Sequence, residues 1–410
     1  MSEFERVFEV IDGYRGEVID LQRALTSRIA LGPENGGSGE HEKTDFIKEL
    51  LKSMAPSGLE EVKVPDKRAR YGYRPNLIAC WGGVKGGPKV WVLSHSDIVP
   101  PGDLSLWESD PYQIKVEGDR IIGRGVEDNQ HGFISSYLGL RAVFESGLDF
   151  KRSAGLVIVA DEETGSEYGL GYLIKNHANL FKAEDLIVVP DAGDEKGAMI
   201  EVAEKSMLWL KFTVTGEQCH ASMPKKGKNS LFGVARLIVS LARLREQFDL
   251  SEELFSPPES TFEPTKMEAN VPNVNTIPGR GVFFMDCRVL PQYPVEEVLS
   301  ACREIASEIE AELGLDISVE PVYRQEATAP TSPEAPVVKA LAGAIKRVTG
   351  REAKAMGIGG GTVAAFFRRA GLPAAVWSTG FDSAHQPNEY CLISNILTDA
   401  KVFACLFLGQ

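Results

Sequence analysis

The sequence feature that most constrains the fold is an apolar run that ends in three consecutive acids, in the stretch GLVIVADEETG at residues 155–165. The run Leu156–Ala160 is short and rich in β-branched residues, which predicts a strand buried on both faces. Asp161, Glu162 and Glu163 follow it directly. Carboxylates at the end of a buried strand are costly unless a cation or hydrogen-bond donors meet them. The alternative is a solvated turn that caps the next helix, so the choice depends on what other strands bring to the same edge.

Three further apolar runs also end in polar side chains. These runs, with the polar residues that follow them, are Val90–Leu93 with His95 and Asp97, Leu186–Val189 with Asp191, and Ala374–Trp377 with His385. Helical segments alternate with the runs, which predicts an α/β sheet in mostly parallel order, flanked by helices. Ligands bind at the carboxyl ends of the strands in such sheets. We therefore expect the polar residues after all four runs to lie on one edge.

Residues 207–323 show a different pattern. The segment MLWLKFTVTG alternates apolar and polar residues, which is typical of a half-exposed antiparallel strand. A helix near 230–247, strands near 271–277 and 281–290, a helix near 294–313 and a strand near 316–322 complete a β-α-β-β-α-β order. This order predicts an inserted ferredoxin-like α+β domain. We therefore divide the chain into a main domain, formed by residues 1–206 and 324–410, and an inserted domain at 207–323.

Two stretches rich in glycine or proline predict connections rather than elements. GGVKGGP, at residues 82–88, joins two expected strands and predicts a hairpin between them. FSPPESTFEPT, at residues 255–265, predicts a surface linker inside the inserted domain.

Composition excludes several classes of protein. The net charge of −14 argues against nucleic acid or an anionic membrane as a partner, because both require a basic surface. No apolar segment reaches membrane-spanning length, and the N-terminus lacks the apolar region of a secretory signal. The 6 cysteines show no CxxC pair, which predicts reduced thiols, so we expect a cytoplasmic protein. The sequence also lacks a GxSxG elbow and a complete dinucleotide fingerprint.

The residues expected at the sheet edge favour a metal site. Two imidazoles and several carboxylates without clustered cysteines are typical of a zinc site with nitrogen and oxygen ligands. One metal needs only three protein ligands, which is fewer than this edge supplies. Two metals bridged by a carboxylate would use the additional ligands. Asp128 in GRGVEDNQ is the candidate bridge. Either Glu162 or Glu163 would fit a general base, because neighbouring side chains on an extended backbone point apart. Capping and core packing are the alternative for each residue.

Short motifs are spread over most of the chain, from about residue 76 to 390: SHSDIVPPGD with a later W and DPY, GRGVEDN, ADEETGS, the acid of PDAG, GEQCHAS, NTIPG, DCR, GGGT and His385. Together they resemble the di-zinc aminoacylase/carboxypeptidase superfamily, which includes succinyl-diaminopimelate desuccinylase, acetylornithine deacetylase, aminoacylase and several dipeptidases. The resemblance implies a metal-dependent hydrolase of amino-acid metabolism that cleaves the amide bond of an N-acyl-amino acid or of a dipeptide. A non-catalytic descendant that binds peptides or amino acids is the alternative, and retention of Glu162 beside a full ligand set speaks against it.

The resemblance implies a role for each matching residue at the edge. The implied ligands are His95, Asp128 and Asp191 for one metal, and Asp128, Glu163 and His385 for the other. Glu162 would be the general base, and Asp97 would orient His95 through its other ring nitrogen. The implied cofactors are two divalent ions, zinc in the first place, with cobalt or manganese as alternatives. The peptide bond between Asp128 and Asn129 is expected to be cis.

The resemblance also implies that the inserted domain forms a homodimer and closes over the catalytic site. His220 in GEQCHAS is similar to a histidine that reaches the partner subunit's site and stabilises an oxyanion. The residues implied for substrate binding are Asn275, Arg288, Gly359, Gly360, Gly361 and Thr362. A solvated hairpin is the alternative for His220, and a structural role is the alternative for Asn275 and Arg288. The lysines at 225, 226 and 228 are typical of a solvated loop rather than of a funnel for anionic substrates.

The chain departs from the superfamily's pattern at three positions. The usual DMKG or DDKG reads DNQHG here, with an extra imidazole at His131 that is more typical of a packed histidine than of a ligand. GGGTVA lacks the acid that commonly follows the threonine, so recognition of a substrate ammonium there is not supported. Asp191 replaces a glutamate that is common in the deacetylase branch, which slightly favours dipeptides or short peptides.

Overall fold

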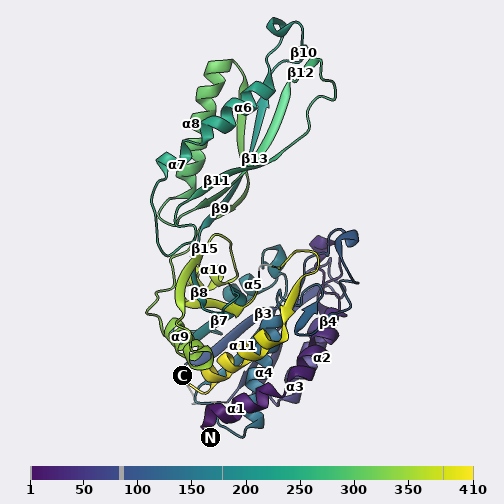
Figure 1. The fold of residues 1–410 in the computed structure, drawn as a ribbon, viewed down its shortest axis with the longest axis vertical. Helices are drawn as coiled ribbons and strands as arrows, with labels where there is room; N and C mark the ends of the chain where they lie inside the picture. Colours follow the sequence, from purple (N-terminus) through teal and green to yellow (C-terminus); the bar gives the residue numbers. More distant parts are fainter. Residues whose placement is uncertain (1, 83–86, 178, 382, 410) are drawn as a thin grey trace. The chain divides into compact units, whose positions relative to one another are not determined.

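The structure is a computed structural model that describes residues 2–82, 87–177, 179–381 and 383–409. The chain forms two compact units (Figure 1). Unit 1 comprises the chain up to Val202, Thr331–Ala355 and the chain from Thr362 onward, and unit 2 comprises Ala203–Pro330 and Met356–Gly361. Within the described ranges, every helix is too short or too polar to span a bilayer.

Unit 1 is built on a large sheet with the strand order β1-β2-β6-β3-β7-β16-β8-β15. These strands are β1 (Gly58–Pro65), β2 (Tyr73–Trp81), β3 (Lys89–His95), β6 (Ser153–Val159), β7 (Leu186–Asp194), β8 (Met199–Glu204), β15 (Lys354–Ile358) and β16 (Ala374–Thr379). The central strands β6, β3, β7 and β16 run parallel, and β1, β2 and β8 pair antiparallel on the flanks. The carboxyl ends of the central strands therefore share one edge.

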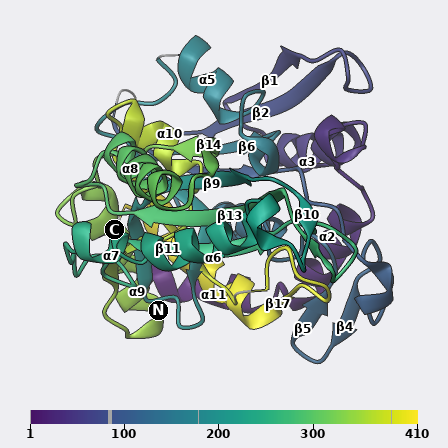
Figure 2. The ribbon, with the colours of Figure 1, turned by 90° about the horizontal axis from the view of Figure 1, so that it is seen from above.

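Helices cover both faces of this sheet. They are α1 (Glu3–Asp12), α2 (Arg15–Thr26), α3 (His41–Ser53), α4 (Gln130–Glu145), α5 (Leu170–Asn176), α9 (Pro336–Thr349), α10 (Ala364–Arg369) and α11 (Ile393–Phe407). Val376 packs with α5 and α10, whereas the next residue, Trp377, meets Phe403 of α11 with ring centroids 5.8 Å apart. This alternation places α5 and α11 on opposite faces (Figure 2). The predicted α/β class, with a parallel sheet centre flanked by helices, is confirmed.

The hairpin expected at GGVKGGP is wrong. Strand β6 lies between β2 and β3, pairing antiparallel with the first and parallel with the second. Residues 83–86 of the connection lie outside the described residues. The local glycine pattern marks a change of direction, but it does not determine which strand becomes the neighbour. A smaller sheet, with the order β17-β5-β4, combines β4 (Lys115–Glu117), β5 (Arg120–Ile122) and β17 (Tyr390–Leu392).

Unit 2 is an antiparallel sheet with the order β11-β13-β9-β14, and helices pack on one face (Figure 1). Its elements are β9 (Ser206–Thr215), β10 (Cys219–His220), α6 (Ser230–Leu241), α7 (Leu244–Gln247), β11 (Thr261–Met267), β12 (Thr276–Ile277), β13 (Arg280–Val289), α8 (Val295–Leu313) and β14 (Asp316–Gln325). Alternate residues of β9, such as Leu210 and Phe212, enter a core with α6 and α8, while Trp209 is 41% exposed. This is the ferredoxin-like arrangement that the sequence predicted.

The second strand of unit 2 differs from the expectation. The sheet strand is β11, which lies in the segment expected to be a surface linker, and the expected strand near 271–277 is reduced to the short β12. Phe262 of β11 is 4% exposed and stands opposite Cys287 of β13. The prolines at 257, 258 and 264 concealed this strand, although an edge strand tolerates proline because only one of its sides is paired.

Candidate metal centre

His95 is the last residue of β3, and its buried imidazole contacts three carboxylates. Its Nε2 lies 2.8 Å from Asp128 Oδ1 and 3.4 Å from Asp191 Oδ1. Its Nδ1 lies 3.1 Å from the backbone oxygen of Asp97 and 3.4 Å from Asp97 Oδ1. Because β3 and β7 are parallel neighbours, both His95 and Asp191 emerge at the same edge.

Asp97 also holds the turn that follows β6. Its Oδ1 accepts a hydrogen bond from the backbone N–H of Glu162 at 3.1 Å, and its Oδ2 accepts one from the N–H of Glu163 at 3.0 Å. A single buried carboxylate therefore orients His95 and both glutamates. Asp97 thus contacts the ring nitrogen through which the resemblance expects it to orient His95.

Asp128 lies between the two histidines. Its Oδ1 faces His95, and its Oδ2 lies 3.1 Å from His385 Nε2. The same Nε2 lies 3.0 Å from Glu163 Oε2. The Asp128–Asn129 peptide is cis, as expected, and Asn129 Nδ2 donates to Asp191 Oδ1 at 2.7 Å. One carboxylate thus contacts both imidazoles, each through a different oxygen.

The donor atoms are close enough to hold cations. His95, Glu162 and Asp191 present ligand atoms within 4.8 Å of one another, and so do His95, Asp128 and Glu163. Within the described residues, the buried Glu163 Oε1 has no hydrogen-bond partner. A set of imidazole nitrogens and carboxylate oxygens with an unmatched buried oxygen fits divalent ions of the zinc type.

The electrostatics of the cluster also favour a cation. Burial and the charge of Asp191 raise the pKa of Glu162 well above its usual range. Burial and the charge of Asp128 raise the pKa of Glu163 to about 7. Contacts with Asp128 and Glu163 raise the pKa of His385 to about 10. Carboxylates outnumber imidazoles here, so the free cluster retains protons that a bound cation would displace.

Two carboxylates beside the cluster were missed from the sequence. Glu389 is fully buried, pairs with Arg124 at 2.6 Å, and accepts from the backbone N–H of Asp128 at 3.1 Å. Glu127 accepts hydrogen bonds from the backbone of Phe381 and from the Ser383 hydroxyl. The partners are 254–265 residues apart along the chain, so no local spacing signals the contacts.

His131 pairs with an acid on the C-terminal helix. It is 2% exposed, and its Nε2 lies 2.8 Å from Asp399 Oδ2. Asp399 also accepts from the Thr379 N–H at 2.8 Å and from its hydroxyl at 2.6 Å. Together with Asp128 and Asp191, His131 lines a small cavity of about 60 Å³. The packed alternative weighed for this histidine agrees with its buried pairing.

The residues expected to bind substrate fall into separate groups. His220 is exposed, and its Nδ1 accepts from the Ser222 N–H at 3.2 Å and lies 2.8 Å from the Ser222 hydroxyl. Asn275 lies beside it, because its backbone oxygen accepts from the Ala221 N–H at 2.8 Å. Both belong to unit 2. The exposed lysines 225 and 226 lie in a 3-10 turn just after this pair.

Arg288 and the glycine turn form the other group. Arg288 Nη1 donates to the backbone oxygen of Gly359 at 2.9 Å. Its Nε and Nη2 bind the Asp286 carboxylate at 2.7 and 3.0 Å. One face of the Arg288 guanidinium is therefore paired with Asp286. Gly360 and Gly361 follow in unit 2, while Thr362 begins the last part of unit 1.

Comparisons with known proteins identify relatives of this chain. The description "Peptidase family M20/M25/M40" belongs to a family model that matches residues 91–408. An uncharacterized metallohydrolase of Methanococcus maripaludis is 40% identical, over 94% of this chain and 97% of the relative. A succinyl-diaminopimelate desuccinylase of Gluconacetobacter diazotrophicus is 28% identical, over 94% of this chain and 95% of the relative.

Solved structures share the fold. The dipeptidase Dug1p of Saccharomyces cerevisiae has a TM-score of 0.76 at 18% identity, over 100% of this chain and 98% of the other. A metallo-carboxypeptidase of Sulfolobus solfataricus has a TM-score of 0.73 at 19% identity, over 96% and 100%.

Proposed function

Because the chain belongs to peptidase family M20/M25/M40, and is therefore a hydrolase of amides or peptides, we propose that it works with two divalent metals, zinc in the first place. One ion would be held by His95, Asp128 and Asp191, and the other by Asp128, Glu163 and His385. When bound, such a pair polarises the scissile carbonyl and lowers the pKa of water.

The observation that carries the proposal is the position of Asp128. Its two oxygens face different imidazoles, at 2.8 Å from His95 and 3.1 Å from His385. A carboxylate that served only one histidine would need only one of these contacts. A bridge between two cations, in contrast, requires both oxygens to face separate ligand sets.

Glu162 is the proposed general base. Burial and Asp191 raise the pKa of its carboxyl, so it can take up a proton and release it again. It would accept a proton from the attacking water as the new C–O bond forms. It would then give that proton to the amine nitrogen as the C–N bond breaks, leaving a carboxylic acid and an amine. Asp97 would hold the turn of Glu162 and the ring of His95 in fixed positions relative to each other.

The proposed substrates are N-acyl-amino acids, of the succinyl-diaminopimelate or acetylornithine type, and dipeptides. The named relatives include a desuccinylase and a dipeptidase, which supports both classes. The proposed substrate-binding residues are Asn275, Arg288, Gly360, Gly361 and Thr362, with His220 as oxyanion donor. Because Asp286 occupies one face of Arg288, a substrate carboxylate would have to use its remaining donors.

We also propose a homodimer formed through unit 2 and a cytoplasmic location. Helix α6 exposes three large apolar side chains, Leu231 at 43%, Phe232 at 65% and Val239 at 68%. A second copy of the chain would cover this surface, and in a dimer His220 would act in the partner's site.

The test combines metal analysis with a substrate panel. The purified protein is dialysed, its zinc, cobalt and manganese are measured, and N-succinyl-amino acids, N-acetyl-amino acids and dipeptides are screened with each metal added. We expect bound divalent metal, loss of hydrolysis with a chelator, and recovery on adding zinc. Asp128→Asn should lower metal affinity by about tenfold or more and abolish hydrolysis.

Asp194→Asn is the matched control. Asp194 also lies in unit 1 and accepts backbone N–H groups, from Ala198 at 2.6 Å and Met199 at 3.0 Å. It should retain metal and activity. Hydrolysis that survives chelation and the Asp128→Asn change would contradict the proposal. Substrate binding without turnover of any panel member would favour the non-catalytic alternative.

A further inference from the structure

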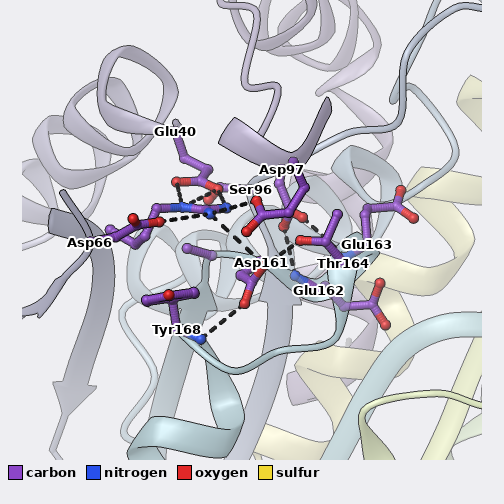
Figure 3. Close-up of polar contacts among 12 residues, drawn as sticks. Glu40, Asp66, Ser96, Asp97, Asp161, Glu162, Glu163, Thr164 and Tyr168 are labelled. Atoms are coloured by element: carbon purple, nitrogen blue, oxygen red, sulfur yellow. Dashed lines mark hydrogen bonds and ion pairs between the residues drawn. The ribbon is translucent and has the colours of Figure 1, made fainter. Parts of the chain in front are cut away.

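The turn after β6 carries Glu162 and Glu163, and side chains behind it determine its shape (Figure 3). Asp161 opens the turn in the left-handed conformation, with φ 63°. Its carboxylate accepts hydrogen bonds from the Thr164 hydroxyl and from the backbone N–H of Tyr168, the latter at 2.9 Å. Asp161 therefore ties the first residue of the turn to residues three and seven positions later.

Strand β2 contacts both ends of this turn. Arg74 and Asn76 are two residues apart, so their side chains lie on the same face of the strand. Asn76 accepts from the Ala160 N–H at 3.0 Å and donates to the Tyr168 backbone oxygen at 2.9 Å. Arg74 Nη1 lies 3.8 Å from Asp161 Oδ1. The neighbouring strand thus supports the turn at its start and at its end.

Arg74 is itself fixed by further acids, and it has no exposed side-chain surface. Its Nε donates to Glu40 Oε2 at 2.8 Å, and its Nη1 lies 3.7 Å from Asp66 Oδ2. Figure 3 shows Asp161 between Glu40 and Asp66 at the left and Glu162 and Glu163 at the right. Buried ion pairs contribute little net stability compared with apolar packing, because the charges lose their hydration. Stability alone is therefore a weak reason for burying these charges behind the turn.

We propose that Arg74 and Asp161 are positioning residues, which set the direction in which Glu162 and Glu163 enter the cluster. Asp97 holds the N–H groups of both glutamates from the cluster side. Asp161, beside Arg74, holds the later part of the same turn through the Thr164 hydroxyl and the Tyr168 N–H. The two glutamates are adjacent yet serve different tasks, so a small rotation of the turn would displace both. The inference rests on the proposed function, because that function gives Glu162 and Glu163 their tasks.

The test compares Asp161→Asn with Asp66→Asn. Asparagine fits the left-handed conformation and keeps the size of aspartate, but it has one acceptor oxygen in place of two, so separate oxygens can no longer accept from the Thr164 hydroxyl and the Tyr168 N–H, and the negative charge is lost. Asp66 is the matched control, because its carboxylate lies 3.7 Å from the same Arg74 nitrogen and its side chain is equally buried. Both changes remove one negative charge beside Arg74. Only one of them lies in the turn.

Three experiments are made: amide hydrogen exchange of residues 162–168 in the metal-free protein, zinc affinity by competition with a chelator, and steady-state kinetics on the best substrate, which give kcat and KM. For Asp161→Asn we expect faster exchange, and a loss of about 10- to 100-fold in zinc affinity and in kcat, with KM nearly unchanged. Asp66→Asn should change melting temperature to a similar extent but leave exchange in the turn, zinc affinity and kcat near the parent values.

Parent-like exchange and zinc affinity in Asp161→Asn would overturn the inference, and so would equal losses in Asp66→Asn. If Asp161→Asn does not fold, Thr164→Val decides, since it removes only the hydroxyl that Asp161 accepts. Thr164→Val should show smaller losses of zinc affinity and kcat than Asp161→Asn. Zinc affinity and kcat equal to those of the parent would count against the inference. If the parent hydrolyses no substrate, the proposed function fails, while exchange and zinc affinity still test the positioning role.

Discussion

A methyl group added at Gly132 should displace a proposed metal ligand. Gly132 lies in the first turn of α4, where a Cβ would stand 2.5 Å from the backbone oxygen of Pro190. Ordinary contact begins at 3.4 Å, so Pro190 must retreat by about 0.9 Å. Pro190 precedes Asp191, and Asn129 donates to both residues, at 2.8 and 2.7 Å. The carboxylate of Asp191 would therefore move with the backbone that carries it.

The expected magnitudes follow from this displacement. Overpacking of a close contact destabilises a protein by about 1–3 kcal/mol. A misplacement of about 1 Å at a catalytic group lowers the rate by roughly 100-fold. For Gly132→Ala we therefore expect a drop in unfolding free energy in that range, together with weaker zinc binding and a kcat reduced by about two orders of magnitude. Chemical denaturation, chelator competition and steady-state kinetics measure the three effects.

Gly139→Ala is the matched control on the same helix. A Cβ at Gly139 would stand 2.4 Å from the backbone oxygen of Ala400 in α11, a clash as severe as the first. Ala400 is part of a packing helix and precedes no proposed ligand. Gly139→Ala should lose similar stability and keep zinc affinity per folded molecule. The reasoning is refuted if both variants lose zinc affinity equally, or if Gly132→Ala is destabilised while its zinc affinity and kcat match the parent.

Two further predictions concern protons. Glu162→Gln should keep its metal and lower kcat by about 10²- to 10⁴-fold, measured by metal analysis and kinetics, and parent-like turnover would remove Glu162 as the base. In the metal-free protein, the contacts of His385 with Asp128 and Glu163 raise its pKa from 6.5 to about 10. These contacts therefore stabilise the fold fully below pH 6.5. Their contribution to stability disappears as the pH rises towards 10. The melting temperature of the metal-free parent should therefore fall more steeply over that pH range than that of His385→Gln, and parallel curves would contradict the assignment.

The fold could be predicted where the hydrophobic pattern of a segment reflects how that segment is buried in the sheet. The apolar runs that became β3, β6, β7 and β16 are buried on both faces, so their sequence reports both strand and position. Strand β11 was missed, because prolines dominate its surroundings and its pairing with β13 depends on a partner further along the chain. The hairpin at GGVKGGP failed for a related reason. Strand β6 inserts between the two expected partners, and no local pattern records that event.

For the candidate site, the convergence of ligands could be predicted, but their support could not. His95 and Asp191 lie near the carboxyl ends of β3 and β7, and Glu163 follows β6, so the common edge of these parallel strands brings them together. Arg74 is different, because an arginine on a strand next to a tyrosine has the sequence appearance of an exposed residue. Its burial depends on Glu40, which is 34 residues distant, and on a turn still further along. The sequence carries each charge, but only the fold shows which charges are paired.

The two loops that carry Asp128 and His385 show how such support determines a ligand position. Neither residue lies in a strand of the large sheet, so strand geometry alone does not place them. Instead, each loop supplies a carboxylate that binds the backbone of the other loop. Glu389 accepts hydrogen bonds from the backbone beside Asp128, and Glu127 accepts one from the backbone before His385. Pairing of β17 with β5 holds the ends of both loops together.

Because Asp128 faces both histidines, movement of its loop would change both proposed ligand sets at once. Movement of Asp97, in contrast, would reach Asp128 through His95, which contacts both carboxylates. The carboxylates of Glu389 and Glu127 therefore couple the two proposed ligand sets through the backbone of both loops. This coupling gives a role to the fully buried Glu389, whose carboxylate binds the N–H of the shared proposed ligand.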